Sequence, residues 1–202
     1  MTGSPQPAFS RNQYDPGYGR YGFIGRSLTN ALTLGGYDWQ VYQGRINNPT
    51  SLREQLVGVD KIFHLAGSES RGRVRLLRHV DIEGTERLLE EARLAGVGHI
   101  VFPSRIGADP NSLHALLRTK GEIERLVRNT GIPFTILRTS TLFGLGDRFT
   151  EIILGLALWN WPFVWLPGGG PIAIQPLWVE EYARCLIDCL EKPELMNQTI
   201  TL

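Results

Sequence analysis

The 202-residue sequence predicts an open α/β fold, in which helices cover the faces of a doubly wound, mostly parallel sheet. Two observations support this prediction. From residue 22 onward, short apolar runs alternate with segments whose apolar residues recur at helical spacing, the pattern of repeated βα units. The composition, with 42% hydrophobic and 20% charged residues, is that of an ordinary globular domain.

The first third of the chain predicts fewer elements than such a sheet usually contains. A helix is expected over residues 26–34, and the next clear strand is 61–65. Between them there is room for one strand, 39–42, and a short helix from Ser51. We therefore expect the sheet to be shortened near the N-terminus by at least one βα unit.

The remainder of the chain alternates more regularly. A helix that starts near Val80 should stop at Gly96, which suits a C-cap, and a helix capped by Ser112 should stop at Gly131. A third amphipathic helix is predicted over 179–190. The strands predicted in this part are 99–102, 133–137 and 199–202.

The N-terminal segment 1–18 is predicted to be irregular, ahead of one domain formed by residues 19–202. Residues 13–18 stand where a buried first strand would be expected. Pro16 and Gly17 argue against a central strand there, because proline cannot donate to the ladder and glycine has no side chain to pack.

Charge and composition exclude several classes of function. The chain has 21 Lys and Arg against 20 Asp and Glu, a net charge of +1. A nucleic-acid-binding protein needs a basic excess to neutralise phosphates, so we expect no nucleic-acid partner. The N-terminus lacks the apolar core of a signal peptide, which favours a cytoplasmic location. The four histidines show no metal-ligand spacing, and no metal site is predicted.

Glycines are frequent, 23 in all, and three of them form a spaced motif before the first helix. Gly19, Gly22 and Gly25 follow the pattern G-x-x-G-x-x-G. In dinucleotide-binding folds such glycines allow a tight turn and let the backbone approach the pyrophosphate at the helix N-terminus. A glycine-rich turn before an ordinary helix would look the same, so the motif alone leaves both interpretations open.

Further phrases stand in a fixed order along residues 19–202. They are Gly22-Phe23-Ile24-Gly25, His64-Leu65-Ala66-Gly67, Asp81-Ile82-Glu83-Gly84-Thr85, Arg118-Thr119-Lys120-Gly121-Glu122 and Leu137-Arg138-Thr139-Ser140. This order resembles the atypical and extended short-chain dehydrogenase/reductase superfamily, which includes NAD-dependent epimerase/dehydratase-like, NmrA-like and complex I 39-kDa-subunit-like proteins. The resemblance implies a Rossmann-like fold that binds NAD or NADP, without distinguishing the two.

Carried over by position, the resemblance implies a cofactor site at the glycine motif. Gly19, Gly22 and Gly25 would cradle the cofactor pyrophosphate, with the backbone amides of Phe23 and Ile24 close by.

The resemblance implies further site residues later in the chain. Ala66 and Gly67 would pass beside the adenine ribose. Ser104 would lie beside the nicotinamide and polarise a substrate carbonyl. Lys120 would reach the nicotinamide ribose, although an exposed helix lysine remains the alternative.

Two positions depart from the family pattern. Leu116 stands where the catalytic tyrosine of the Tyr-x-x-x-Lys motif would be, which puts ordinary carbonyl reduction in doubt. Arg45 stands where an aspartate usually meets the adenine amino group, and a guanidinium cannot accept that hydrogen bond. Arg45 would stack on adenine, pair with a phosphate, or be solvated. The strand 199–202 resembles the start of the family's C-terminal substrate region, most of which we expect to be absent.

The uncharged segment Leu154–Leu166 contains Trp159, Trp161 and Trp165. A core helix is one interpretation; a docking patch for a protein or a membrane surface is the other.

Two functions follow. The first is an NAD(P)-binding protein resembling epimerase/dehydratase-type oxidoreductases, weakly active or inactive on a small carbonyl or sugar-nucleotide substrate. The second is a non-catalytic dinucleotide-binding subunit or redox sensor that docks, peripherally where the partner is a membrane, through the region Trp159–Trp165.

Overall fold

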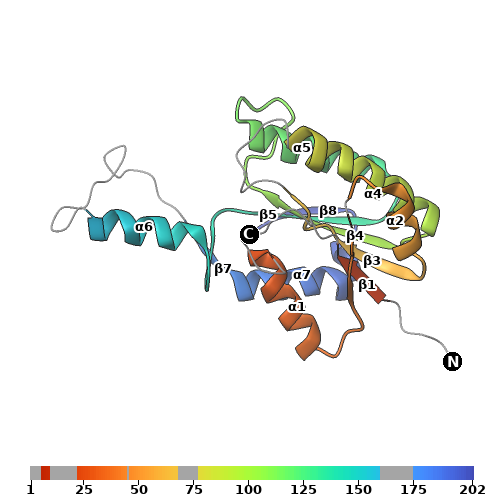
Figure 1. Ribbon diagram of the computed structural model, residues 1–202, viewed down its shortest axis with the longest axis horizontal. Helices are drawn as coiled ribbons and strands as arrows, with labels where there is room; N and C mark the ends of the chain where they lie inside the picture. The colour runs from red at the N-terminus through yellow and green to blue at the C-terminus, as the bar shows by residue number, and fades with distance from the viewer. Residues whose placement is uncertain (1–5, 10–21, 45, 68–76, 160–174) are drawn as a thin grey trace.

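The computed structural model describes residues 6–9, 22–44, 46–67, 77–159 and 175–202, which form a parallel sheet between two layers of helices (Figure 1). The elements in the first half are β1 (Gln6–Phe9), α1 (Phe23–Leu34), β2 (Gln40–Val41), α2 (Pro49–Gln55), β3 (Val59–Phe63), the π-helix η2 (Leu77–Ile82), α4 (Glu83–Ala95) and β4 (His99–Arg105). Those in the second half are α5 (Ala115–Asn129), β5 (Phe134–Thr139), β6 (Leu142–Phe143), α6 (Arg148–Trp159), β7 (Leu177–Trp178), α7 (Val179–Glu191), the 3₁₀-helix η4 (Pro193–Leu195) and β8 (Gln198–Thr201).

The main sheet has six strands in the order β2-β1-β3-β4-β5-β8, and every neighbouring pair is parallel. The chain leaves β1 toward β2 and then crosses to β3 on the other side of β1. This reversal is the mark of a doubly wound sheet and confirms the predicted fold class. One strand, β2, stands between α1 and β3, as the sequence indicated.

The first strand corrects the expectation of an irregular N-terminal segment. Residues Gln6–Phe9 form β1 and pair with both β2 and β3. The register with β3 shifts between Gln6 and Pro7, next to the residue that has no amide to donate. A four-residue strand containing a proline gives almost no strand signal in a sequence. Residues 13–18 stand where a first strand would usually precede the glycine motif, and they lie outside the described residues.

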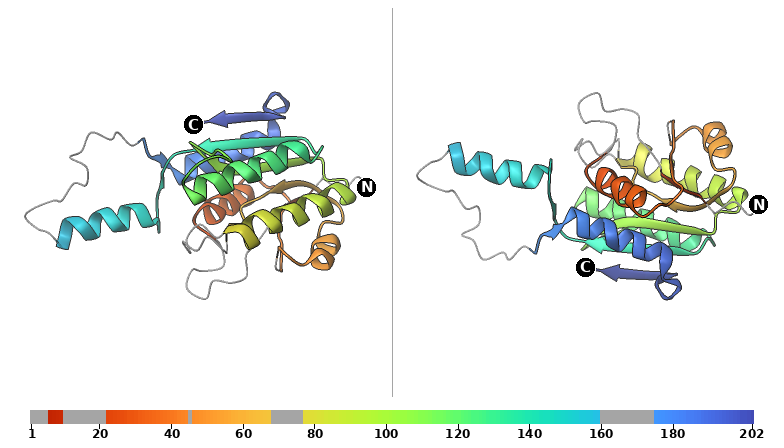
Figure 2. Two further views of the ribbon diagram at one scale, coloured as in Figure 1. Left: turned by 90° about the horizontal axis from the view of Figure 1, so that it is seen from above. Right: turned by 90° about the horizontal axis from the view of Figure 1, so that it is seen from below.

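The side chains of the strands point alternately to the two faces of the sheet and so contribute to two separate hydrophobic cores. Helices α2, α4 and α5 cover one face of the sheet, and α1 and α7 cover the other (Figures 1 and 2). Successive strand residues point to opposite faces, so that each central strand contributes to both cores. The first core contains Ile62, Ile100 and Ile136, and the second contains Phe63, Val101 and Leu137, all nearly or fully buried.

Helix ends agree with the sequence where a glycine decides them. Gly96 caps α4 in the left-handed conformation, with φ of 76°, as predicted. The cap predicted at Ser112 was wrong by two residues, since His114 is the N-cap and α5 begins at Ala115. The Ser112 hydroxyl accepts the His114 amide at 3.2 Å in a turn before the helix, and Leu113 is 96% exposed instead of entering the core.

Helix α6 stands apart from both layers and extends away from the sheet (Figures 1 and 2). It lies in the chain between β6 and β7, which pair as a small parallel sheet, and Asp147 accepts the amide of Thr150 in its first turn at 2.5 Å. Leu154, Leu156, Leu158 and Trp159 are exposed, so the interpretation as a core helix was wrong for residues 154–159. Residues 160–166 of the same prediction lie outside the described residues. Among the described residues, no helix is long and apolar enough to cross a membrane.

Two helix glycines provide a test of the packing on α5. A Cβ at Gly121 would lie 2.3 Å from the Pro110 nitrogen and 2.4 Å from the Asp109 carbonyl carbon, whereas one at Gly155 in α6 would meet nothing within 4 Å. We expect Gly121→Ala to lower the free energy of unfolding by about 2 kcal/mol, since backbone must shift. Gly155→Ala should leave it unchanged or raise it by up to about 1 kcal/mol. Urea denaturation measures both, and equal effects would contradict the close packing at Gly121.

Candidate functional site

The strand order places a candidate ligand site at the carboxyl ends of β1 and β3. In open α/β sheets, ligands bind outside the strand ends at the point where the strand order reverses. Here β2 and β3 lie on opposite sides of β1, which locates that point between β1 and β3. The N-terminus of α1 follows β1 in the chain. Gly19 belongs to the connecting residues 10–21, which lie outside the described residues.

The N-terminus of α1 suits an anionic ligand. Gly22 is its N-cap in an extended conformation, and no side chain caps the helix. The first intrahelical hydrogen bond runs from the Arg26 amide to the Gly22 carbonyl at 3.0 Å. The amides of Phe23, Ile24 and Gly25 therefore precede that bond, at the positive end of the helix dipole. The first turn contains no acidic residue, and a Cβ on Gly22 would meet nothing within 4 Å.

The end of β3 approaches the same region. Ala66 is buried and Gly67 is exposed, three and four residues beyond Phe63, the last residue of the strand. Their predicted place beside an adenine ribose agrees with the topology but stays a prediction. Arg45, the position expected near adenine, lies outside the described residues.

Ser104 lies at the carboxyl end of β4 and is 3% exposed. Its hydroxyl donates to the Glu124 carboxylate, with 2.6 Å between Oγ and Oε1. A serine has a single hydroxyl proton, so in this arrangement it is not available to polarise a carbonyl. The catalytic role of Ser104 stays a prediction, while the described contact is a structural one.

The Glu124 carboxylate is fully buried and collects charged donors from two elements. Arg138 of β5 binds both its oxygens, Nε to Oε1 at 2.8 Å and Nη2 to Oε2 at 2.6 Å, and Arg128 of α5 donates to Oε2 at 2.8 Å. Burial alone would raise the pKa of Glu124, but the hydrogen bonds from Arg138, Ser104 and Arg128 outweigh it and hold the pKa below its usual value.

Lys120 is buried, with 8% exposure, so the exposed-lysine alternative was wrong. Its Nζ lies 3.4 Å from the Pro103 carbonyl oxygen and 5.0 Å from the centre of the Phe102 ring. Lys120 therefore reaches the carboxyl end of β4, but its contact with a nicotinamide ribose stays a prediction. Leu116, one turn earlier on α5, is half-buried and offers no proton donor.

His64 is a buried residue at the end of β3. The Thr85 hydroxyl donates to the Asp81 carbonyl, so the 2.7 Å contact between Thr85 Oγ1 and His64 Nε2 requires a proton on Nε2. The ring stacks on Phe102 with 5.6 Å between centres. Burial, and secondarily the positive charge of Lys120, lower the pKa of His64 to about 3. His64 is thus neutral at physiological pH and acts in packing.

The site predicted from the sequence omitted Glu124 and Arg138 as a pair. Glu124 lies four residues after Lys120 on α5, and Arg138 belongs to a phrase used only for the resemblance. The sequence did offer one signal for Glu124, since its carboxylate stands one helical turn after the candidate Lys120. Its arginine partner comes from a different strand, which no local spacing in the sequence reveals.

The acid-free N-terminus of α1, at the switch point of a parallel doubly wound sheet, defines a dinucleotide-binding α/β protein of the Rossmann type. Comparison with known proteins agrees with this class. The chain belongs to the NAD(P)H-binding family, whose model matches residues 24–151.

Relatives and solved structures resemble the chain over different lengths. The 40 kDa subunit of the mitochondrial NADH-ubiquinone oxidoreductase of Neurospora crassa is 31% identical over 51% of this chain and 28% of its own length. A photosystem II assembly factor of Trieres chinensis is 24% identical over 88% of this chain and 54% of its own length. The UDP-N-acetylglucosamine 4-epimerase from Bacillus cereus has the same fold, with a TM-score of 0.73 at 20% identity over 98% of this chain and 78% of that one.

The chain therefore has an NAD(P)-binding, epimerase/dehydratase-like fold that is shorter than that of its structural neighbours. Its matched region spans between about a quarter and about half of the curated relatives' length, 28% and 54% for the two named here.

The Glu124 cluster leads to a stability prediction. Glu124→Gln keeps the shape of the side chain but leaves the partly buried Arg138 without its counter-charge, and we expect the free energy of unfolding to fall by about 3 kcal/mol. The matched control is Asp188→Asn, which removes the carboxylate of an exposed pair with Lys192 at 2.8 Å and should cost less than about 1 kcal/mol. Similar losses in urea denaturation would show that the cluster adds no special stability.

The buried histidines predict acid sensitivity. Burial lowers the pKa of His99 to about 4, with a further contribution from Lys61, and His64 titrates lower still. Their folded-state pKa values lie below the unfolded value of about 6.5, so both groups bind protons preferentially in the unfolded chain. Their contribution to stability is present above that value and is lost as the pH falls from about 6.5 toward 4.

The change in unfolding free energy with pH measures this effect. Each buried histidine should contribute up to about 1.4 kcal/mol per pH unit in that window. His64→Gln should flatten the dependence by one such contribution, whatever its own effect on stability at pH 7. A variant curve parallel to that of the wild type would contradict the neutral, buried state of His64.

Proposed function

We propose that this protein binds NAD or NADP with the pyrophosphate at the N-terminus of α1. One observation supports the proposal above all: α1 begins at the switch point with Gly22 as its cap, no acid in its first turn and no capping side chain. A phosphate at that position would accept the amides of the first turn and meet the positive end of the helix dipole. The family match over residues 24–151 supports the same ligand.

Carbonyl reduction should be weak or absent in this protein. Leu116 supplies no phenol one turn before Lys120, and the Ser104 hydroxyl proton is donated to Glu124. A substrate carbonyl or sugar-nucleotide ketone would have to obtain its proton from water or from the substrate itself. We therefore expect dinucleotide binding without efficient turnover.

A second function is favoured by the exposure of α6. A non-catalytic dinucleotide-binding subunit or redox sensor needs a surface for its partner, and α6 exposes apolar side chains up to and including Trp159 at 90%. Trp161 and Trp165 of the predicted patch lie outside the described residues. Relatives named as a subunit of NADH-ubiquinone oxidoreductase and as a photosystem II assembly factor support a role beside larger complexes. A cytoplasmic location, peripheral at a membrane where the partner is membrane-bound, stays a prediction.

Two variants of Gly22 test the proposed binding mode. Asp and Asn are equally good N-caps, so neither Gly22→Asn nor Gly22→Asp should disturb α1. The aspartate places a negative charge beside the pyrophosphate, and we expect Gly22→Asp to weaken NADH and NADPH binding about tenfold relative to Gly22→Asn. Titration of purified protein followed by nucleotide fluorescence measures both affinities, with thermal unfolding as the check on folding.

The wild-type protein should bind at least one of the two nucleotides saturably, with little oxidation of it in the presence of carbonyl or sugar-nucleotide substrates. Absence of binding to either nucleotide at about millimolar concentration would overturn the proposal. A Kd of that size corresponds to a binding free energy of roughly 4 kcal/mol. Equal affinities of the two Gly22 variants would place the pyrophosphate elsewhere. Efficient turnover would reject the non-catalytic candidate.

A further inference from the structure

Arg26 occupies an electrostatically unfavourable position, at the positive end of the α1 dipole. Its amide closes the first turn by donating to the Gly22 carbonyl at 3.0 Å, and its side chain is exposed. A cation stabilises a helix near the C-terminus but opposes the helix dipole near the N-terminus. Helix α1 contains no acidic residue and no capping side chain that would offset this charge. Local violations of this kind are typical of functional positions, where a ligand supplies the missing partner.

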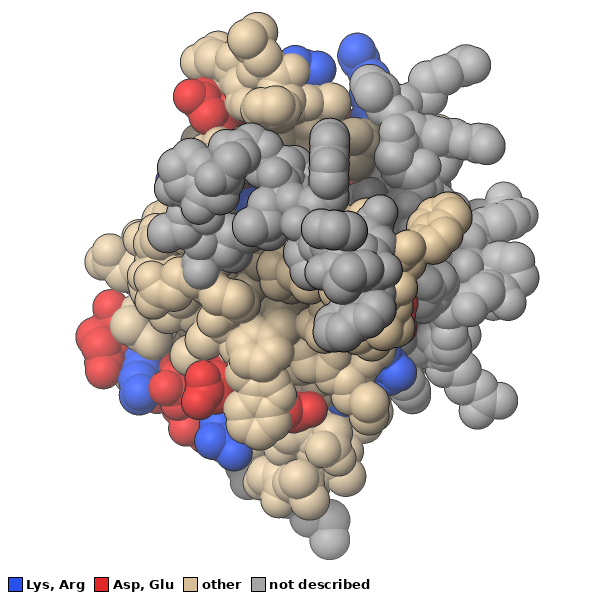
Figure 3. Space-filling view, turned by 90° about the vertical axis from the view of Figure 1, so that its left-hand side faces the viewer, with Lys and Arg blue, Asp and Glu red and all other residues tan. Residues whose placement is uncertain are grey.

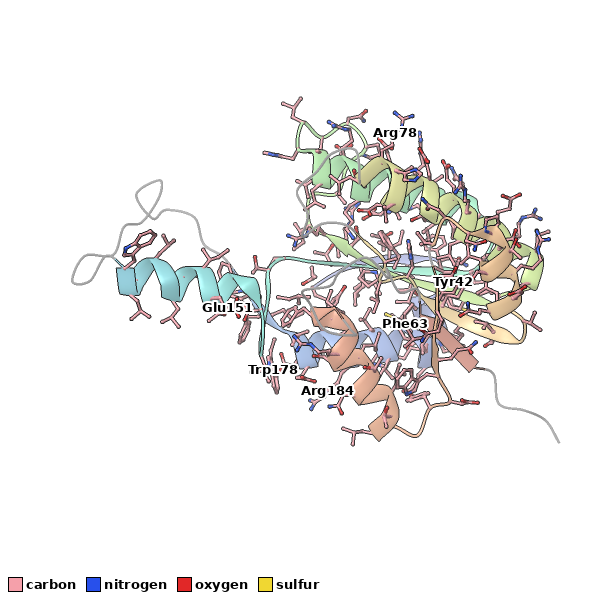
Figure 4. All side chains as sticks on the ribbon, viewed as in Figure 1. Tyr42, Phe63, Arg78, Glu151, Trp178 and Arg184 are labelled. Carbon is pink, nitrogen blue, oxygen red and sulfur yellow. The ribbon has the colours of Figure 1, made fainter. Side chains whose placement is uncertain are left out.

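Two other helices of the described chain show how such a charge is ordinarily compensated. Helix α7, on which Arg184 is labelled in Figure 4, lies beside α1 and has two acids in its own first turn. Arg118 holds the place in α5 that Arg26 has in α1, and its guanidinium donates to the Ser112 carbonyl at 3.0 Å. Within the described residues, the Arg26 guanidinium takes part in no ion pair.

The Arg26 guanidinium lies at the carboxyl edge of the sheet. Helical side chains lean toward the helix N-terminus, so this one extends back toward the first-turn amides of α1. It packs against Gly146 in the turn between β6 and α6, where a Cβ on the glycine would lie 2.7 Å from Arg26 Nη2 and 3.7 Å from Nη1. That turn follows the carboxyl end of β5, so the guanidinium stands between two segments at the opening of the proposed site.

Two acids on the adjacent segments are bound to other donors. The Asp147 carboxylate accepts two backbone amides of its own turn. Glu180 of α7 accepts the Ser27 hydroxyl at 3.1 Å. On the described surface at this end of the molecule, Lys and Arg side chains are few and scattered (Figure 3). Arg26 is therefore a single cation beside helix amides and not part of a broad basic surface.

This arrangement fits a diphosphate better than a single phosphate. The first-turn amides of α1 bind one phosphate through the backbone. A guanidinium beside them binds a second phosphate through charge-assisted hydrogen bonds. The two phosphates of a dinucleotide share one bridging oxygen, so that neighbouring donors on one helix turn reach both of them.

The 2′-phosphate of NADP is a less suitable partner for Arg26. In dinucleotide-binding folds the adenosine ribose meets the end of the strand that follows the first helix, which is β2 in this sheet. Arg26 instead packs against Gly146, beyond β5. Since β2 and β5 lie on opposite sides of β1, the guanidinium points away from the adenosine side.

We propose that Arg26 binds the second phosphate of the dinucleotide pyrophosphate, next to the phosphate bound by the α1 amides. The ligand then removes the unfavourable contact between the guanidinium and the helix dipole. This assignment rests on the proposed function, because it gives a residue of the same site its role.

Calorimetric titration of the full-length protein with NADH, NADPH and ADP-ribose tests the role of Arg26. ADP-ribose keeps the pyrophosphate but lacks the nicotinamide. We expect Arg26→Met to weaken the binding of all three ligands about tenfold, because charge-assisted hydrogen bonds to a phosphate are lost. The wild-type affinity should fall between about 0.05 M and about 0.5 M salt, where charges are screened, and the affinity of the variant should fall less.

The matched control is Arg93→Met, which removes the same charge from an exposed arginine in the last turn of α4. It should bind all three ligands as the wild type does. Thermal unfolding without ligand gives a second readout. Arg26→Met should unfold at the wild-type temperature or above it, because its charge opposes a helix dipole, whereas Arg93→Met loses a favourable charge and should unfold at a lower temperature.

Equal affinities of Arg26→Met and the wild type would overturn the role of Arg26 and leave the proposed function intact. A loss confined to NADPH would place Arg26 at the 2′-phosphate, and a loss that spares ADP-ribose would place it at the nicotinamide; both would overturn the pyrophosphate contact. A clearly lower unfolding temperature of Arg26→Met would show a structural role instead. A wild type that binds none of the three ligands would reject the proposed function itself.

Discussion

The buried carboxylate of Glu124 is the contact on which the second half of the sheet depends. It joins α5 to β4 through Ser104 and to β5 through Arg138, and Arg128, which also binds Glu124, reaches β8 through a 2.9 Å contact with Thr199. A buried carboxylate without donors would be costly, so these partners must form together or not at all. The cluster therefore sets the position of α5 against three strands, and with it the depth at which Lys120 enters the site.

The first half of the sheet is organised by a different constraint, the reversal of strand order at β1. Because β2 and β3 lie on opposite sides of β1, the two helical layers separate at this point, and the N-terminus of α1 faces the opening. The helix dipole then acts on that opening, and the first turn of α1 contains no acidic residue to oppose it. The proposed recognition of an anion by backbone amides would account for a site marked by glycines and not by a cluster of basic residues in a chain of nearly neutral charge.

Helix α6 belongs to neither of the two helical layers that cover the sheet (Figure 1). The α/β layers bury their apolar residues within the chain, whereas α6 is linked to them through the short β6–β7 pair and leaves its apolar residues in solvent (Figure 1). Beyond Glu151 its sequence resembles that of a core helix, because this part is uncharged and rich in leucine. Burial is a property of the surroundings and not of the helix, which is why composition alone favoured the core interpretation.

The sequence by itself determined the repeated βα pattern, the single strand between α1 and β3, the glycine cap at Gly96 and the family to which the chain belongs. These features follow from local spacing, backbone conformation or the order of short phrases, all of which are written along the chain. The tertiary structure alone decided the strand at Gln6–Phe9, the burial of Lys120 and the union of Glu124 with Arg138. Each of these depends on a partner distant in the chain, and hydrogen bonds and burial between distant residues leave no periodic trace in the sequence.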